Sequence, residues 1–191
     1  MTLHPIDIDS LRINPFTFVG LQWLAICAGT EERDYNAMCA SWGQLGALWE
    51  RRDPGSTPHR GLPTVSVFVR PQRHTRTLLD RDELFSVCSL PADKRRALAY
   101  LGSHSGRDED KLVASGLTPA FAPQGTVYIA ESDLVFICRK LYTAPLQQEG
   151  FIDTSLIAAN YPKLDFHQAY VGEIVAAYAS DRFDSQGDAS R

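Results

Sequence analysis

The chain has 191 residues, 44% of them hydrophobic and 22% charged, which is typical of one globular domain and excludes a disordered chain. Its net charge of -4 argues against a general nucleic-acid binder. The first residues form no signal peptide, and no apolar run reaches the length of a membrane span. We therefore expect a cytoplasmic protein with neither a nucleic-acid nor a membrane partner.

The composition predicts three parts: an N-terminal arm over residues 1–14, one domain over 15–180, and a polar, disordered tail over 181–191. Within the domain, Phe16 to Gly29 is predicted to be a long strand or a bent pair of strands. Gly20 in its middle is typical of a β-bulge.

The segment Asn36–Gly43 is small, nearly uncharged and of mixed polarity. Its residues alternate poorly, which disfavours a simple half-buried strand. Ala37, Ala40 and Gly43 leave its backbone uncovered, as a flat polar ligand read by peptide groups would require. The alternative is a core strand with small residues at a crowded contact, and the segment by itself favours that alternative.

A surface loop is expected over 50–63, because prolines, glycines and arginines gather there. Thr64–Arg70 is β-branched and aromatic, which predicts a strand ended by Pro71. A short helix through Leu78 and Leu79, capped by Thr75, is expected next. A strand over 84–90 follows it.

Two helices are predicted over 91–101 and 107–115. Gly102 is expected in the left-handed position after the first helix, and Ser105 as the cap of the second, which Gly116 ends. Strands follow over 126–129, 133–141 and 168–178, with an irregular stretch over 143–166. The absence of a strict strand–helix alternation predicts a mainly β, antiparallel barrel with helical insertions.

The four cysteines form no C-x-x-C pair and lie in apolar segments, so we expect buried, reduced thiols. The five histidines are scattered, which argues against a metal site. The sequence also contains no P-loop, dinucleotide, serine-hydrolase or zinc-protease signature.

Two further polar clusters lie at the ends of predicted elements. Arg70–Thr75 combines arginines, an imidazole and a hydroxyl, a set that can hold a phosphate or simply be solvated at a strand exit. Gly102–Lys111 can expose N–H groups to an anion, but Ser105 as a helix cap and the neighbouring carboxylates offer a structural alternative.

In sequence order these clusters resemble the flavin reductase-like family of FMN-binding split barrels, to which flavoredoxin is related. The resemblance lies in Asn36–Gly43, Phe68–Thr75, Gly102–Lys111, Cys138–Tyr142 and Tyr170–Ile174, and covers about residues 15–178. It implies an antiparallel Greek-key split barrel that binds FMN, with a homodimer whose flavin lies near the subunit interface.

The resemblance also implies which residues contact FMN. The ring would lie along the segment that contains Asn36, Ala37, Met38, Cys39, Ser41 and Trp42. The phosphate would be approached by Arg70, Arg73, His74 and Thr75, and the contacts completed by Ser103, His104, Ser105, Gly106 and Lys111. Cys138 would belong to a barrel strand and have no redox role.

Two positions and one insert depart from the family pattern. Cys39 replaces a frequent threonine, His104 replaces a frequent lysine, and the insert from about 52 to 63 is longer than in many relatives. The histidine would make the local charge depend on pH.

The implied activity is an FMN-dependent NAD(P)H oxidoreductase that passes hydride or electrons to a flavin or another small acceptor, with no catalytic side chain assigned. The alternative is a non-catalytic FMN carrier that docks with a protein partner. A barrel that binds another ligand, or none, stays open as well, because fold alone does not decide function.

Overall fold

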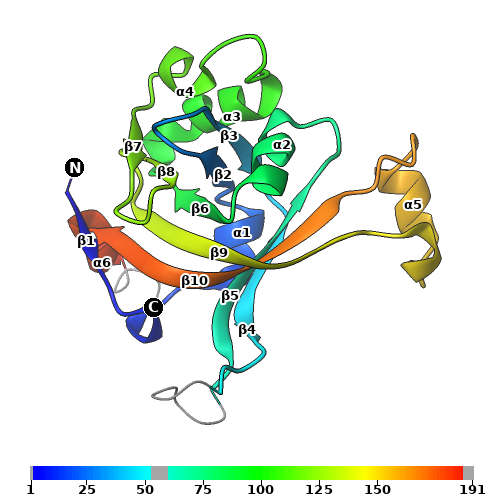
Figure 1. Cartoon of the computed structure of the whole chain (residues 1–191), viewed down its shortest axis with the longest axis horizontal. Helices are drawn as coiled ribbons and strands as arrows, with labels where there is room; N and C mark the ends of the chain where they lie inside the picture. The colour runs from blue at the N-terminus through cyan, green and yellow to red at the C-terminus, as the bar shows by residue number, and fades with distance from the viewer. Residues whose placement is uncertain (1, 53–59, 187–191) are drawn as a thin grey trace.

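The computed structural model describes residues 2–52 and 60–186 and is built on one curled, antiparallel sheet (Figure 1). The strands in spatial order are β3 (Tyr35–Ala40), β2 (Leu24–Gly29), β6 (Leu84–Ser89), β9 (Leu134–Pro145), β10 (Gln168–Ser180), β5 (Leu62–Val69) and β4 (Gly43–Leu48). The short β1 (Leu3–Pro5) pairs with β10. The expected mainly β, antiparallel fold is confirmed.

Helices and a small hairpin cover both faces of the inner strands. α2 (His74–Arg81) packs Leu78 and Leu79 against one face. The opposite face is covered by α3 (Arg95–Ser103), α4 (Lys111–Ala114), β7 (Pro119–Phe121) and β8 (Val127–Ile129). In Figure 1 α3, α4 and the β7–β8 hairpin form the upper layer, while β9 and β10 run on to the right toward α5 (Ser155–Asn160).

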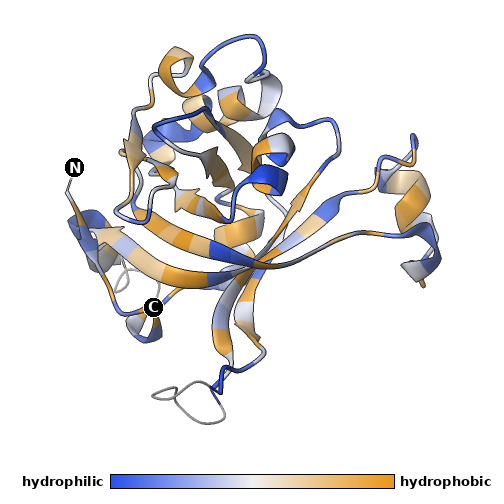
Figure 2. Cartoon of the chain, viewed as in Figure 1, coloured by the Kyte–Doolittle hydropathy of each residue, from blue (hydrophilic) through white to orange (hydrophobic). Residues whose placement is uncertain are grey.

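The core has two apolar clusters, one on each face of the inner strands. Along β2, Ile26 packs into one cluster and its neighbour Cys27 into the other, and all six residues of the strand are buried. Figure 2 shows apolar residues gathered along β9 and β10 beneath the helical layer. Burial on both faces explains why β2 and the first half of β9 are continuous apolar runs, without polar alternation.

The prediction of strand over Phe16–Gly29 is wrong in its first half, where α1 spans Pro15–Gly20. The Asn14 side chain accepts a hydrogen bond from the N–H of Phe16 at 3.1 Å, and Pro15 occupies the first helical position. An asparagine cap followed by proline is a helix start, and Gly20 ends that helix without forming a bulge.

Several predicted helix boundaries are also wrong. Arg73 is the N-cap of α2, so Thr75 lies inside the helix. Gly102 is the penultimate residue of α3, and α4 is capped by Asp110 and not by Ser105. The Asp110 carboxylate reaches two N–H groups of α4, which a serine five residues upstream cannot do. Gly116 does end the helix, at φ +75°.

The C-terminal half contains more regular structure than expected. The strands predicted over 64–70, 84–90 and 168–178 are confirmed, and β9 extends through 143–145. The irregular stretch includes α5, a short 3-10 helix over Gln148–Gly150 precedes it, and α6 (Asp181–Gln186) replaces part of the tail predicted to be disordered. Residues 53–59 of the predicted loop and 187–191 of the tail lie outside the described residues.

Further 3-10 turns occupy Ile8–Ser10 in the N-terminal arm and Ala92–Lys94 before α3. Within residues 2–52 and 60–186, no helix has the length and apolar character needed to cross a bilayer. All four cysteines are free, as expected, and three are buried while Cys39 is half-buried.

Candidate functional site

The segment singled out in the sequence forms an edge strand. β3 pairs with β2 on one side and with no other strand of the described residues. Every second residue of an edge strand turns its N–H and C=O away from the sheet, where they can pair with another molecule. Ala37 and Met38 are buried, with side chains in opposite core clusters, so what this part of the strand presents outward is its backbone.

Two segments meet beside this open edge: the start of α2, and the stretch between α3 and α4. The guanidinium of Arg73, at the start of α2, donates to the carbonyl of Gly102 at 2.7 Å. That of Arg107 donates to the carbonyl of Gln72 at 3.2 Å. A β-carbon at Gly102 would lie 3.3 Å from Cβ of Cys39, so α3 approaches β3 closely at its end.

Asn36 connects three of these elements. Its side chain is buried and donates to the hydroxyl of Thr75 in α2 at 2.9 Å. Its amide oxygen would lie 2.3 Å from a β-carbon added at Gly106. Only glycine therefore allows the loop before α4 to approach the amide so closely.

Cationic side chains gather at this junction without carboxylate partners. Among the ion pairs of the described residues, none includes Arg73, Arg107 or Lys111. Lys111 is 4% exposed, and its ammonium donates to the carbonyl of Leu101 at 2.9 Å. Burial, with repulsion from Arg73, lowers the pKa of Lys111 to about 8.

His74 adds an unpaired polar atom to the same cluster. Its Nδ1 is buried and has no hydrogen-bond partner among the described residues. Burial first, and then the charge of Arg107, lower the pKa of His74. His74 begins α2, whose N-cap makes no side-chain capping bond, so the positive end of this helix stays open to an anion.

These observations fit the phosphate and ring of FMN. A phosphate would neutralise the unpaired cations, accept from the first turn of α2 and give Nδ1 of His74 a partner. The open edge of β3 offers N–H and C=O groups to a planar ring with polar edges. Of these groups, Arg107 is absent from the contacts that the resemblance implies, although it lies within the segment Gly102–Lys111.

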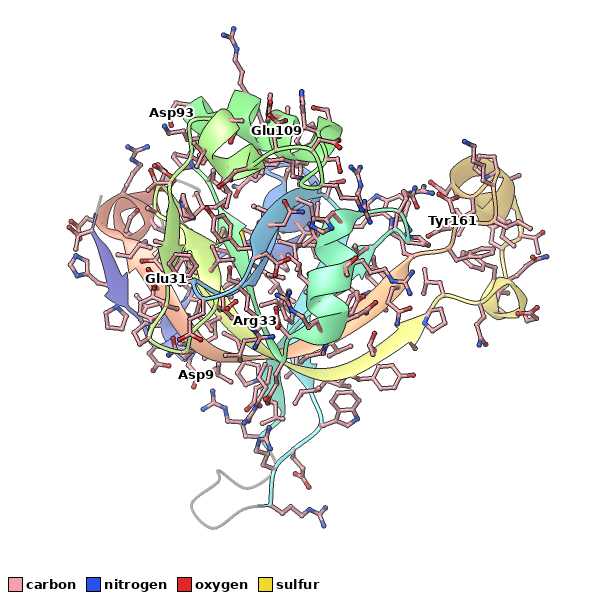
Figure 3. The ribbon with its side chains drawn as sticks, turned by 45° about the horizontal axis from the view of Figure 1, so that its top comes forward. Asp9, Glu31, Arg33, Asp93, Glu109 and Tyr161 are labelled. Carbon is pink, nitrogen blue, oxygen red and sulfur yellow. The ribbon has the colours of Figure 1, made fainter. Side chains whose placement is uncertain are left out.

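Arg70 is directed elsewhere. Its guanidinium pairs with Asp165 at 2.6 Å, donates to the carbonyl of Asn160 at 2.7 Å and lies 5.2 Å from the ring centroid of Tyr161. These partners belong to the projection that carries α5, where Figure 3 shows Tyr161 facing the body of the molecule. Arg70 thus ties this projection to β5, while Arg73 remains in the cationic cluster.

The other predicted loop residues are exposed or partly exposed. The ring of His104 stacks on Tyr100, with centroids 3.6 Å apart, and its Nδ1 lies 3.0 Å from the Ser103 hydroxyl. The hydroxyl of Ser105 accepts from the N–H of Arg107 at 3.2 Å. The side chains of Ser103 and His104 therefore make contacts at the C-terminal end of α3 itself. Ser105 stabilises the turn that carries Arg107.

A cavity of about 780 Å³ adjoins the end of β3. Ser41 and Trp42 line it together with Phe16, Phe68 and Tyr161. The ring of Trp42 lies 4.9 Å from that of His167, a residue the sequence did not single out. His167 is buried against the hydroxyl of Tyr161 at 2.8 Å, and burial lowers its pKa to about 4, so it is neutral at pH 7.

Comparisons with solved structures agree with this architecture. An FMN-binding protein from Thermus thermophilus, with bound 1-cyclohex-2-enone, superposes with a TM-score of 0.58 at 24% identity, over 82% of this chain and 69% of that one. Flavoredoxin of Desulfovibrio vulgaris gives a TM-score of 0.60 at 16% identity over 93% and 77%. A putative flavin reductase with a split-barrel domain from Shewanella frigidimarina gives 0.61 at 17% over 91% and 77%.

A search among curated proteins finds no match to the sequence. The family model described as "Flavin reductase like domain" matches residues 61–187, about two thirds of the chain. β3 lies before the matched residues, so its assignment to the candidate site rests on its position beside the cationic cluster and not on the family model. The chain belongs to the flavin reductase-like family and has the fold of its FMN-binding split barrels.

Proposed function

We propose that the protein binds FMN and is an NAD(P)H-dependent oxidoreductase that passes electrons to a flavin or another small acceptor. The observation that supports this most directly is the cluster of unpaired cations at the open end of α2, beside the free edge of β3. A family member with such a cluster has a ready site for a phosphate attached to a flat ring.

In this proposal the chain binds and orients the cofactor. Arg73, Arg107 and Lys111 hold the phosphate, and the first N–H groups of α2 add donors. The backbone of β3 pairs with the polar edge of the ring, and the cavity at Trp42 admits the acceptor. Bound FMN would supply the chemistry, because it can accept a hydride from NAD(P)H, which leaves as NAD(P)⁺, and give two electrons to the acceptor.

We further propose a homodimer. Phe16 and Ile152 are 85% and 98% exposed, and Trp49 and Tyr142 form an exposed aromatic pair with centroids 6.3 Å apart. Large apolar side chains that a single subunit leaves exposed would be covered in a subunit interface. Sedimentation at micromolar concentration tests this, since a monomer under all conditions would contradict it.

The first experiment is the flavin content of the purified protein and its affinity for added FMN. Arg73→Ala is expected to weaken FMN binding about tenfold or more, since it removes a charged partner of the phosphate. Arg52→Ala is the control, because this arginine is 87% exposed and pairs with Glu50. Equal affinities of the two variants would contradict the phosphate placement, and failure of the wild type to bind FMN would refute the function.

Rapid mixing of the FMN-loaded protein with NADH and NADPH then separates the two modes of action. Flavin bleaching on the timescale of turnover supports the reductase. Loss of colour only with a reduced protein partner, and not with either nucleotide, would identify the non-catalytic electron carrier.

A further inference from the structure

The cavity beside Trp42 carries no charged side chain. Among the described residues that line it, none is an aspartate, glutamate, lysine, arginine or histidine. Two other cavities of the described chain are lined by arginine and aspartate side chains as well as by apolar ones. An ionised group that is buried without a partner carries a large desolvation cost. The cavity beside Trp42 therefore favours an uncharged ligand.

The wall of this cavity is largely aromatic and aliphatic. Its large apolar side chains are Phe16, Val19, Trp42, Leu45, Leu48, Phe68, Leu146 and Tyr161. The indole of Trp42 is 44% exposed, and a planar ring that stacks on it gains contact area and the favourable geometry of an aromatic pair. The volume of about 780 Å³ lies within the range of roughly 300–1,000 Å³ that is typical of small-molecule sites.

Two of the ring side chains are held in position by His167. The rings of Trp42 and Tyr161 lie 4.9 and 5.5 Å from the ring of His167, and the Tyr161 hydroxyl lies 2.8 Å from its Nδ1. His167 is buried and neutral at pH 7, since its pKa is lowered to about 4. The nearby guanidinium of Arg70 is paired with Asp165 at 2.6 Å. No net charge therefore acts on the cavity through this wall.

The cavity adjoins the segment that the proposed flavin ring follows. That segment is Asn36–Trp42, and its last two residues, Ser41 and Trp42, line the cavity. β4 follows at Gly43 and continues the lining as far as Leu48. A ligand in the cavity thus lies at the corner between β3 and β4, at the end of the ring site.

The polar groups of the lining are neutral hydroxyls and amides. They include the side chains of Ser41, Gln44 and Ser66. These groups can donate hydrogen bonds to a carbonyl oxygen, but they cannot neutralise a carboxylate or a phosphate.

We propose that the electron acceptor of this site is an uncharged, planar ring compound, of which a quinone is the simplest example, and that anionic acceptors such as a second, free FMN are rejected. This inference rests on the proposed function. In the overall reaction one quinone, one NAD(P)H and one proton give one hydroquinone and one NAD(P)⁺. The quinone gains two electrons and two protons, and the nucleotide is oxidised.

The test compares the binding of 2-naphthamide and 2-naphthoate, which share a ring system and differ in charge, by calorimetry on FMN-loaded and FMN-free protein. The neutral probe is expected to bind at least about tenfold more tightly. Trp42→Ala is expected to weaken 2-naphthamide about tenfold, and Trp42→Phe to retain most of the affinity. Trp49→Ala is the matched control, because this tryptophan is 49% exposed and does not line the cavity.

A second pair of variants tests the role of charge by adding it. Gln44→Lys introduces a cation into the lining and is expected to raise the affinity for 2-naphthoate about fivefold, with 2-naphthamide changed less than twofold. Gln148→Lys is the matched control, since Gln148 is exposed and outside the cavity. Equal effects of the two lysines would contradict a ligand seated beside Gln44.

The remaining outcomes separate this inference from the proposed function. Equal affinities for the two probes, or equal losses in Trp42→Ala and Trp49→Ala, overturn the inference, and so does binding of neither probe, as a second copy of the chain seated in the cavity would cause. With FMN-loaded protein and NAD(P)H, duroquinone is expected to give at least a tenfold higher kcat/KM than free FMN, and the reverse order refutes the acceptor class. Selection of 2-naphthamide by a protein that never binds FMN refutes the oxidoreductase and the acceptor role, while the ligand class of the cavity stands.

Discussion

Replacing Lys111 with methionine is expected to stabilise the FMN-free protein and to weaken its binding of FMN at the same time. Lys111 is 4% exposed and forms no ion pair with any carboxylate of the described residues. Its charge is therefore unfavourable for the folded protein until an anion binds. Methionine keeps the length of the side chain and removes the charge.

The lowered pKa of Lys111 sets the size of the effect on stability. Lowering the pKa of Lys111 from 10.5 to about 8 corresponds to roughly 3 kcal/mol against the protonated form at pH 7. The variant also leaves the carbonyl of Leu101 without its donor, at a cost of about 1 kcal/mol. A net gain of about 2 kcal/mol is expected, while FMN loses a charged partner worth about 1.5–3 kcal/mol, or roughly tenfold to a hundredfold in affinity.

Urea unfolding of the FMN-free proteins, with midpoint and slope both fitted, measures the first effect, and fluorescence titration with FMN the second. The pH dependence gives an internal check. Below pH 8 Lys111 is protonated in both states and its penalty is complete. Between pH 8 and 10.5 the folded state loses the proton first, so wild-type stability rises relative to the variant and the difference shrinks.

A variant that is less stable than the wild type at pH 7, with FMN affinity unchanged, would contradict both expectations. That result would mean that Lys111 is a structural cation with a partner in the folded chain. Arg96→Gln, on an exposed part of α3, controls for the general loss of one positive charge.

Two further results are expected. Gly106→Ala forces a β-carbon to within 2.3 Å of the Asn36 amide, so we expect it to lower the free energy of unfolding in urea by about 1–3 kcal/mol and to weaken FMN binding. Gly46→Ala is the control and leaves FMN binding unchanged, because nothing lies within 4 Å of its new carbon. Equal effects of the two variants would refute the close contact at Gly106. In the native protein only Cys39, which is half-buried, is expected to react with a thiol reagent, and the other three thiols react only when the protein unfolds. Rapid reaction of a second thiol would contradict the burial of those three cysteines. Retention of the rapid phase in Cys39→Ala would contradict it as well.

Local sequence was enough to predict the strands whose own residues strongly favour β structure. The β-branched run of β5 and its terminating Pro71 predicted that strand correctly, and β6 and β10 followed from the same signals. The family resemblance also led to the correct fold. The helix of Pro15–Gly20 was missed because its apolar residues alternate like those of a strand, while the deciding signal was the Asn14 cap.

The sequence by itself determined the fold class, the family and the segments that carry the candidate site. Only the tertiary structure decided that β3 is an edge strand, because the number of a strand's neighbours depends on pairing with distant parts of the chain. The tertiary structure also separated Arg70 from Arg73, since Asp165, 95 positions away, pairs with Arg70. Among the described residues, no carboxylate forms an ion pair with Arg73 or Lys111. Charge compensation is a property of three-dimensional neighbours, and spacing along the chain does not reveal it.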